Sequence, residues 1–170
     1  SDVSVADAAT LAADTHVATL DVGGSSSDIS AAFDTLAGLA KLTSLTLNNE
    51  NGTLSLTAAQ VLGNTATLAK ISNGYQIDAT AATLADLPTL KSASNLASIG
   101  VSDSAANVAD QLDDLTALGG LLGSVHLTDA SPLLALKQSD WSDGATVLAK
   151  IDGSYGVALS EVDPGAVASL

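Results

Sequence analysis

The chain has 170 residues, and its five lysines stand against 19 acidic residues, which gives a net charge of −14. Such a polyanion repels phosphate backbones and anionic lipid headgroups, so nucleic-acid and membrane-surface partners are not expected. No stretch approaches the roughly 18 apolar residues of a membrane span, so membrane insertion is not expected either. Hydrophobic residues make up 46% of the chain and aromatic residues only 2%, without Cys or Met. We therefore expect a core of many thin, similar layers, as in a repetitive fold.

Short segments that alternate between apolar and polar residues recur along the whole chain, each bounded by Gly, Ser, Asn or Asp. Alternation of this kind is typical of strands with one buried face. In chain order these segments are residues 3–5, 20–22, 45–47, 75–77, 99–101, 125–127 and 157–159. Residues 53–56 and 133–136 are expected to add a short strand in every third turn.

Segments with helical spacing lie between these strands. Apolar residues recur at intervals of three and four over 29–42 and 108–118, and more loosely over 61–71 and 141–151. Candidate N-caps precede them: Ser26, Ser27 or Asp28, then Thr57, then Ser102, Asp103 or Ser104. The pattern predicts helices of about 10 to 14 residues, a common length in globular proteins.

Two octapeptides, LAKISNGY at residues 68–75 and LAKIDGSY at 148–155, reveal an internal repeat. A shift of 80 residues aligns 44–90 with 124–170 without a gap, and a shift of 79 continues the match upstream. One residue is inserted in the second module, near Gly123. The sequence thus predicts a single solenoid domain over 1–170, with a partial N-terminal repeat at 1–17, module one at 18–96 and module two at 97–170.

Short strands that alternate with helices imply parallel pairing through right-handed crossovers. Nothing in the pattern reverses the strand order. We therefore predict the α/β class, as a right-handed α/β solenoid with short sequential parallel strands on one side and helices on the other. Its outline resembles a leucine-rich repeat, although the LxxLxLxxN signature is absent.

Three phrases carry a more specific resemblance: DSAANVA at residues 103–109, LDDL at 112–115 and SVHLTD at 124–129. With the LAKI-to-Tyr block, they resemble a recurring unit of large acidic bacterial surface proteins, often exported by type I secretion. The resemblance implies an extracellular or cell-surface location and a structural or adhesive role. The glycine-rich calcium nonapeptide of such proteins is missing. The first 14 residues lack the pattern of a secretory signal, so an export signal is expected to be removed or to lie elsewhere in a longer chain.

Residue types that support catalysis are few. His16 and His126 show no paired spacing such as HExxH, and His126 alternates with apolar neighbours, which predicts solvent exposure. No Cys nucleophile exists, and no serine lies in a GxSxG elbow. Residues 23–27, GGSSS, lack the P-loop lysine, so a glycine-rich turn with an N-cap is favoured over a phosphate loop. No catalytic or cofactor-binding residue is assigned.

Carboxylates are better candidates for a functional site, because pairs of them serve as glycosidase catalysts or calcium ligands. Asp113 and Asp114 are adjacent on an expected helix and point different ways, which indicates a solvated face. Asp103 and Asp129 close strands, where capping is the ordinary role.

Trp141 and the turn at residues 49–52 each allow both a functional and a structural interpretation. Asp140 and Asp143 flank Trp141, which is either a sugar platform or a partly buried anchor, and its counterpart Val61 favours the anchor. Residues 49–52, NENG, form an oxygen-rich turn without the ligand order of an EF-hand. Calcium at such a turn is an open alternative, and the metal site is unknown.

We predict a non-enzymatic structural repeat module of a bacterial cell-surface or secreted protein, acting as a scaffold or in surface interaction. Its expected partners are neighbouring repeats of the same or a longer chain, and a surface glycan or protein. A glycan- or host-binding adhesin module is the alternative, with contacts at Trp141 or on the sheet face. A polysaccharide-active enzyme is a more remote alternative.

Paired residues in the two modules yield three further expectations. Lys70 and Lys150 should lie near helix C-termini, where a cation meets unpaired carbonyls. The dipeptides at 73–74 and 152–153 should end those helices. Tyr75 and Tyr155 should be largely buried, with their hydroxyls on a backbone group or at the solvent edge.

Overall fold

The computed structural model describes residues 2–163 and shows a mixed α/β chain whose strands pair in parallel. Two compact units are present. Residues 2–80 and 88–97 belong to the first, and residues 81–87 and 98–163 to the second. The strands β5 (Tyr75–Ala82) and β6 (Leu96–Asp103) contribute residues to both units.

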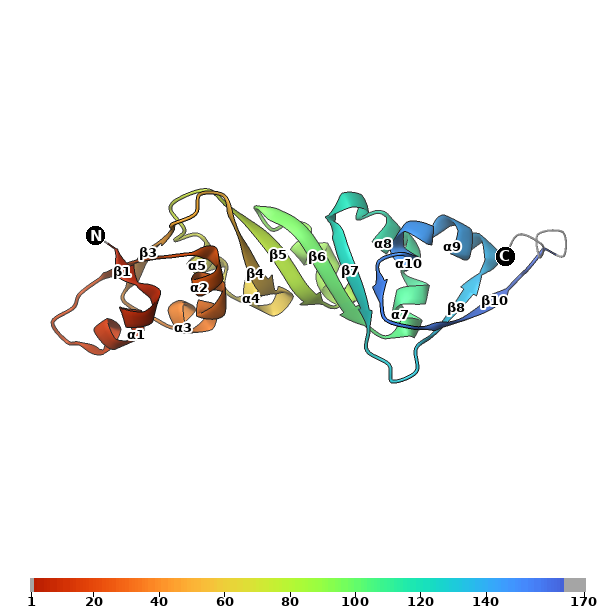
Figure 1. Cartoon of the computed structure of the whole chain (residues 1–170), viewed down its shortest axis with the longest axis horizontal. Coiled ribbons are helices and arrows are strands. Elements are labelled where there is room, and N and C mark those ends of the chain that lie inside the picture. Colours follow the sequence, from red (N-terminus) through yellow and green to blue (C-terminus); the bar gives the residue numbers. More distant parts are fainter. Residues whose placement is uncertain (1, 164–170) are drawn as a thin grey trace. The chain divides into compact units, whose positions relative to one another are not determined.

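The first unit contains two groups of parallel strands. The strands β1 (Val3–Ser4), β2 (Leu20–Gly24) and β3 (Leu42–Leu47) form a sheet in that order. The strand β4 (Gly52–Thr57) pairs instead with β5, with Leu54 opposite Ile77 (Figure 1). Consecutive strands β3 and β4 thus belong to different sheets, and Leu45 of β3 bridges to Ile71. The described strands therefore do not form one continuous sequential sheet.

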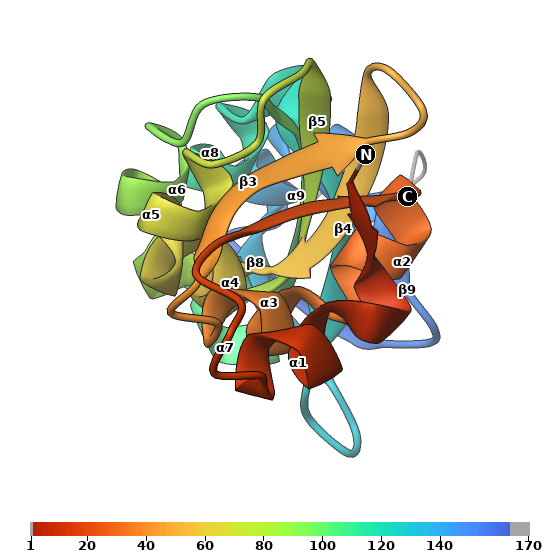
Figure 2. The ribbon, with the colours of Figure 1, turned by 90° about the vertical axis from the view of Figure 1, so that its left-hand side faces the viewer.

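Short helices connect these strands, and Figure 2 shows α1 and α3 below β3. The helices are α1 (Val5–Ala13), α2 (Ser26–Ala31), α3 (Phe33–Ala37), α4 (Ala58–Gly63), α5 (Thr65–Leu68) and α6 (Leu87–Leu90), which begins in the second unit. The pattern gave no expectation of α1 or α6, and Val5 starts a helix rather than ending a strand. The N-cap of α2 is Ser25, one residue before the expected candidates, and Thr57 caps α4 as expected.

Each long helix expected from the pattern is in fact a pair of short ones. Ala32, at φ −102° and ψ 9°, separates α2 from α3, and Asn64 separates α4 from α5 in the same way. These residues leave the helical region of φ/ψ space, so the chain turns between the two helices. Ile29 of α2 and Phe33 and Leu36 of α3 all lie in the core, where each is at most 1% exposed.

The second unit is built in the same way. The strands β6, β7 (Leu122–Leu127) and β9 (Ile151–Asp152) lie in that order, and β8 (Leu133–Lys137) pairs with β10 (Gly156–Ser160). Its helices are α7 (Ala105–Asp110), α8 (Leu112–Thr116), α9 (Gln138–Asp143) and α10 (Ala145–Leu148), with 3₁₀ turns η1 (Leu84–Asp86) and η2 (Gly119–Leu121).

The textual repeat is a structural repeat. A shift of 79 converts the bounds of α2 and α3 into those of α7 and α8, and a shift of 80 converts β3, α4 and α5 into β7, α9 and α10. Leu68 and Leu148 occupy equivalent elements, each at the end of the second helix of a pair. Thr43 and Gly123 are structurally equivalent, because each lies where the pairing register shifts by one residue. Thr43 does so in the pairing of β3 with β2, and Gly123 in the pairing of β7 with β6. The inserted residue therefore falls between α8 and β7, around η2, where Gly119 has φ 56°, and not at Gly123.

Candidate functional site at Tyr75

Both histidines are exposed, as the strand pattern predicts for His126. His16 follows α1, and its side chain is 94% exposed, with Nδ1 3.0 Å from Oδ1 of Asp14. Hydrogen bonds from the backbone amide and side chain of His16 lower the pKa of Asp14. His126 lies on β7, opposite Asp152 of β9.

The acidic candidates are spread over exposed helix surfaces. Asp113 and Asp114 are exposed on α8, and Asp143 is exposed on α9. Asp140 accepts a hydrogen bond from the backbone amide of Lys137 at 3.2 Å. No three His, Asp or Glu side chains within residues 2–163 are placed to hold a metal ion. None of those described helices has the length and apolar run needed to cross a bilayer.

Asp103 and Asp129 have the capping role that their positions predict. Oδ2 of Asp129 accepts from the amide of Ala105, 24 residues earlier, at 2.6 Å. Asp103 accepts from the amides of Leu84 and Ser104 and from the side-chain amide of Asn107. Burial acts to raise the pKa of Asp103, but these hydrogen bonds together hold it below its ordinary value.

The turn at 49–52 uses its polar atoms in the same way. Asn49 is the counterpart of Asp129, and its Oδ1 accepts from the amide of Ser26 at 2.9 Å, while its Nδ2 donates to Oγ of Ser26. In both units, therefore, the residue type that was a candidate calcium ligand caps the helix of the preceding turn.

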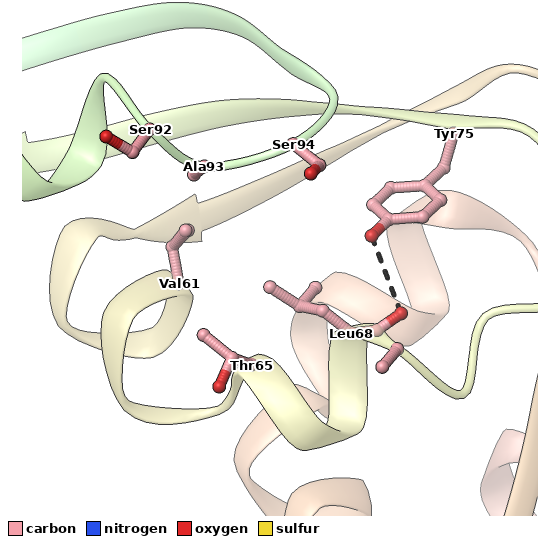
Figure 3. A pocket seen from close by; sticks show the side chains of 8 residues that line it. Val61, Thr65, Leu68, Tyr75, Ser92, Ala93 and Ser94 are labelled. Carbon is pink, nitrogen blue, oxygen red and sulfur yellow. Dashed lines mark hydrogen bonds between the residues drawn. The ribbon is translucent and has the colours of Figure 1, made fainter.

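Tyr75 lies at the edge of a hollow of about 340 Å³ in the first unit. Figure 3 shows its ring beside Leu68 of α5, with Val61 of α4 and the segment Ser92–Ser94 around the space between them. The Tyr75 hydroxyl donates to the carbonyl of Leu68 at 3.4 Å. Tyr75 is half-buried, so the expectation of a largely buried ring is wrong, while the bond to a backbone group is as expected.

The chemistry of this Tyr75 hollow is neutral. Its lining combines the hydroxyls of Thr65, Ser92 and Ser94 with apolar side chains, and includes no carboxylate, lysine or histidine. Such a surface accommodates a neutral group through van der Waals contacts and hydroxyl hydrogen bonds. It offers no general acid or base that titrates near neutral pH.

The second unit repeats the inner wall of the hollow. Tyr155 donates to the carbonyl of Leu148 at 3.4 Å, as Tyr75 does to Leu68. Trp141 stands where the first unit has Val61, and it is half-buried, as an anchor would be. Sequence reasoning found both tyrosines but missed the outer wall, because Ser92–Ser94 belong to a loop with no periodic pattern.

No family model, curated protein or solved structure matches this chain.

Proposed function

We propose that the chain is a non-enzymatic structural repeat module of a bacterial cell-surface or secreted protein, built as a right-handed α/β solenoid. The observation that carries the proposal is the repetition of helices, strands and their cross-turn caps at offsets of 79 and 80 residues. In an array of this kind, each turn is stabilised mainly by its neighbours, so length can be added without redesign of the core. A high negative charge and the absence of Cys and Met suit exposure outside the cell.

Module insertion tests this role directly. Joining residues 1–96 to residues 18–170 adds one module in phase, because residue 17 corresponds to residue 96 at the 79-residue offset. A scaffold predicts a folded, monomeric product with unchanged circular dichroism per residue. The denaturant m-value should rise in proportion to the added surface if the longer array unfolds as a unit.

A control insertion joins residues 1–96 to residues 30–170, which breaks the phase within α2. This product should aggregate or lose cooperative unfolding, because the hydrophobic faces no longer continue one another. Equal behaviour of the in-phase and out-of-phase chains would contradict the scaffold proposal.

A glycan-binding adhesin role is the second candidate, and the Tyr75 hollow is the observation in its favour. An aromatic ring beside hydroxyl groups is a common way to hold a neutral sugar, and Trp141 offers a second ring in the other unit. A glycan array probed with the natural chain, Tyr75→Ala and Trp141→Ala separates the roles. Loss of a specific signal in either variant, with the chain still folded by circular dichroism, would favour the adhesin.

A further inference from the structure

The outer edge of a strand is covered in one module, and within residues 2–163 no strand covers the equivalent edge in the other. In the first unit, the amide of Ile77 on β5 donates to the carbonyl of Asn95 at 2.7 Å. The residues just before Asn95, Ser92–Ser94, form the outer wall of the Tyr75 hollow. Ile77 is only 1% exposed. The covering segment, residues 87–103, therefore meets the edge of β5 at Asn95 and its face at Ser92–Ser94.

The equivalent strand β10 has the same inner partner. Val157 lies opposite Leu134 of β8, as Ile77 lies opposite Leu54 of β4, and β8 and β10 run side by side in Figure 1. The amide of Gly156 donates to the carbonyl of Pro132, on the β8 side, at 2.9 Å. Since successive amides of a strand point to opposite edges, the amide of Val157 points away from β8. It points in the direction in which the Ile77 amide finds Asn95.

The outer side of β10 differs from that of β5. Within residues 2–163, β8 is the only strand that pairs with β10. Val157 and Leu159 are half-buried, whereas their counterparts Ile77 and Ala79 are at most 1% exposed. Leu133, on the neighbouring β8, is 57% exposed. An apolar strand with one unpaired edge is the surface on which a further strand adds, through backbone hydrogen bonds and alternate side chains.

The internal repeat specifies what fits there. The covering segment, residues 87–103 (LPTLKSASNLASIGVSD), contains one lysine and one aspartate. The covering segment is therefore nearly neutral. A chain of net charge −14 repels a second whole copy of itself, but it does not repel this segment.

We propose that the outer edge of β10, together with Tyr155, Val157 and Leu159, binds the covering segment of a further module of the same repeat. The bound segment has the chemistry of residues 87–103 and lies parallel to β10. Its serine-rich loop passes over Tyr155, and a carbonyl at the position of Asn95 accepts the amide of Val157. This inference names the partner implied by the proposed scaffold role and rests on that role.

A synthetic peptide of residues 87–103, titrated into the full 170-residue chain, tests the proposal. Amide NMR spectra should show saturable shifts at 155–160, and the Val157 amide should become protected from hydrogen exchange. A peptide of the same composition in scrambled order should give neither effect.

The key variant is Val157→Pro, which removes the outward amide and leaves the bonds to β8, a change that edge strands tolerate. Val157→Ala is its matched control, because it trims the side chain but keeps the amide. We expect peptide affinity to fall at least tenfold in Val157→Pro and no more than about threefold in Val157→Ala, with both chains still folded by circular dichroism.

Three outcomes overturn the proposal: no binding to the natural chain, equal binding to Val157→Pro, or self-association of the chain that protects Val157 without peptide. The last outcome would make a second copy the occupant. Because the in-phase insertion described above does not depend on free peptide, its success alongside failed peptide binding would overturn this inference alone. Should Val157→Pro fail to fold, the scrambled peptide and the exchange of the Val157 amide still decide the matter.

Discussion

The side chain of Asn73 brackets the backbone of Leu47. Its Nδ2 donates to the Leu47 carbonyl at 2.7 Å, and its Oδ1 accepts from the Leu47 amide at 3.0 Å. The carboxamide thus supplies the two hydrogen bonds that a neighbouring strand would supply at the end of β3. Asn73 therefore does not end helix α5, which stops at Leu68, and Gly74 does not have positive φ. The expected role of residues 73–74 as the helix terminator is wrong.

Asn73→Asp should destabilise the chain at neutral pH. A carboxylate cannot donate, so it leaves the Leu47 carbonyl facing an anionic oxygen while keeping only the bond from the Leu47 amide. We expect a loss of about 1 to 3 kcal/mol in the free energy of unfolding, measured by urea denaturation. The deficit should shrink at low pH, where a protonated carboxyl group can donate again.

Asp152→Asn is the matched control for this prediction. Asp152 lies next to Gly153, the counterpart of Asn73, and it is exposed in β9. The change should alter stability by less than about 0.5 kcal/mol, as surface substitutions generally do. Similar effects at 73 and 152 would show that the bracket on Leu47 contributes nothing specific.

Tyr75→Ala should cost more stability than Tyr155→Ala. Both hydroxyls make the same bond, but only Tyr75 has the outer wall Ser92–Ser94 packed around its ring in the described structure. We expect a loss of about 2 kcal/mol or more for Tyr75→Ala, below the range for fully buried aromatics, and about half of that for Tyr155→Ala. Thermal unfolding of the two variants measures this difference.

Phe substitutions at the two positions isolate the hydroxyl group. A bond of 3.4 Å is long for an O–H donor, so Tyr75→Phe and Tyr155→Phe should each cost less than about 1 kcal/mol. Larger losses from Phe than from Ala would contradict a packing role for either ring.

Asp103→Asn should produce a pH-dependent loss of stability. The pKa of Asp103 is lowered in the folded chain, so its contribution is present above the unfolded value of about 3.9 and is lost as the pH falls below it. An amide at this position would turn one donor toward the Leu84 and Ser104 amides. We expect a deficit on the order of 1 kcal/mol between pH 5 and 7.

Urea unfolding at several pH values tests whether the stabilisation by Asp103 is lost as the pH falls. The gap between the natural chain and Asp103→Asn should narrow below about pH 4, because only the natural carboxylate becomes protonated. A gap that stays constant, or widens, as the pH falls would rule out the capping role of the ionised group.

Lys70→Met should weaken the join between α5 and β3. The Lys70 ammonium group donates to the carbonyl of Leu42, the first residue of β3, at 2.7 Å, and Lys150 contacts Leu122 of β7 in the same way. Met keeps most of the aliphatic stem and loses the donor. We expect about 1 kcal/mol of destabilisation, with Lys91→Met at an exposed position as a control that changes charge equally. Equal losses of stability in Lys70→Met and Lys91→Met would show that the effect comes from the change in net charge and not from the hydrogen bond to Leu42.

Periodicity predicted most strands and the repeat itself, because alternation and the LAKI blocks are local signals. It also placed both lysines beyond helix C-termini, where Lys70 and Lys150 follow the C-caps Ala69 and Ala149. It did not show that these ammonium groups reach the start of a strand 28 residues earlier. That partner depends on how successive turns stack, which no spacing along the chain reports.

The errors have a common physical origin. Ile29, Phe33 and Leu36 fit one continuous helix by spacing, yet Ala32 breaks that helix without a Gly or Pro to mark the break. Likewise, β3 and β4 are close in sequence but pair with different strands, because pairing is chosen by tertiary packing. The candidate site depended on the loop Ser92–Ser94, whose position over Tyr75 has no local signature.

The cross-turn caps have a consequence for the order in which the protein is made. The amide of Ser26, in the first turn of α2, is satisfied by Asn49, and that of Ala105, in the first turn of α7, by Asp129. On the ribosome, these two amides must therefore wait for more than 20 further residues to emerge before their cross-turn acceptors arrive. Folding should lag synthesis by one turn, and arrest-peptide force profiles should show a step just after Asn49 and another just after Asp129 clear the exit tunnel. Asn49→Ala should erase the first step and leave the second, so that each turn completes the one made before it.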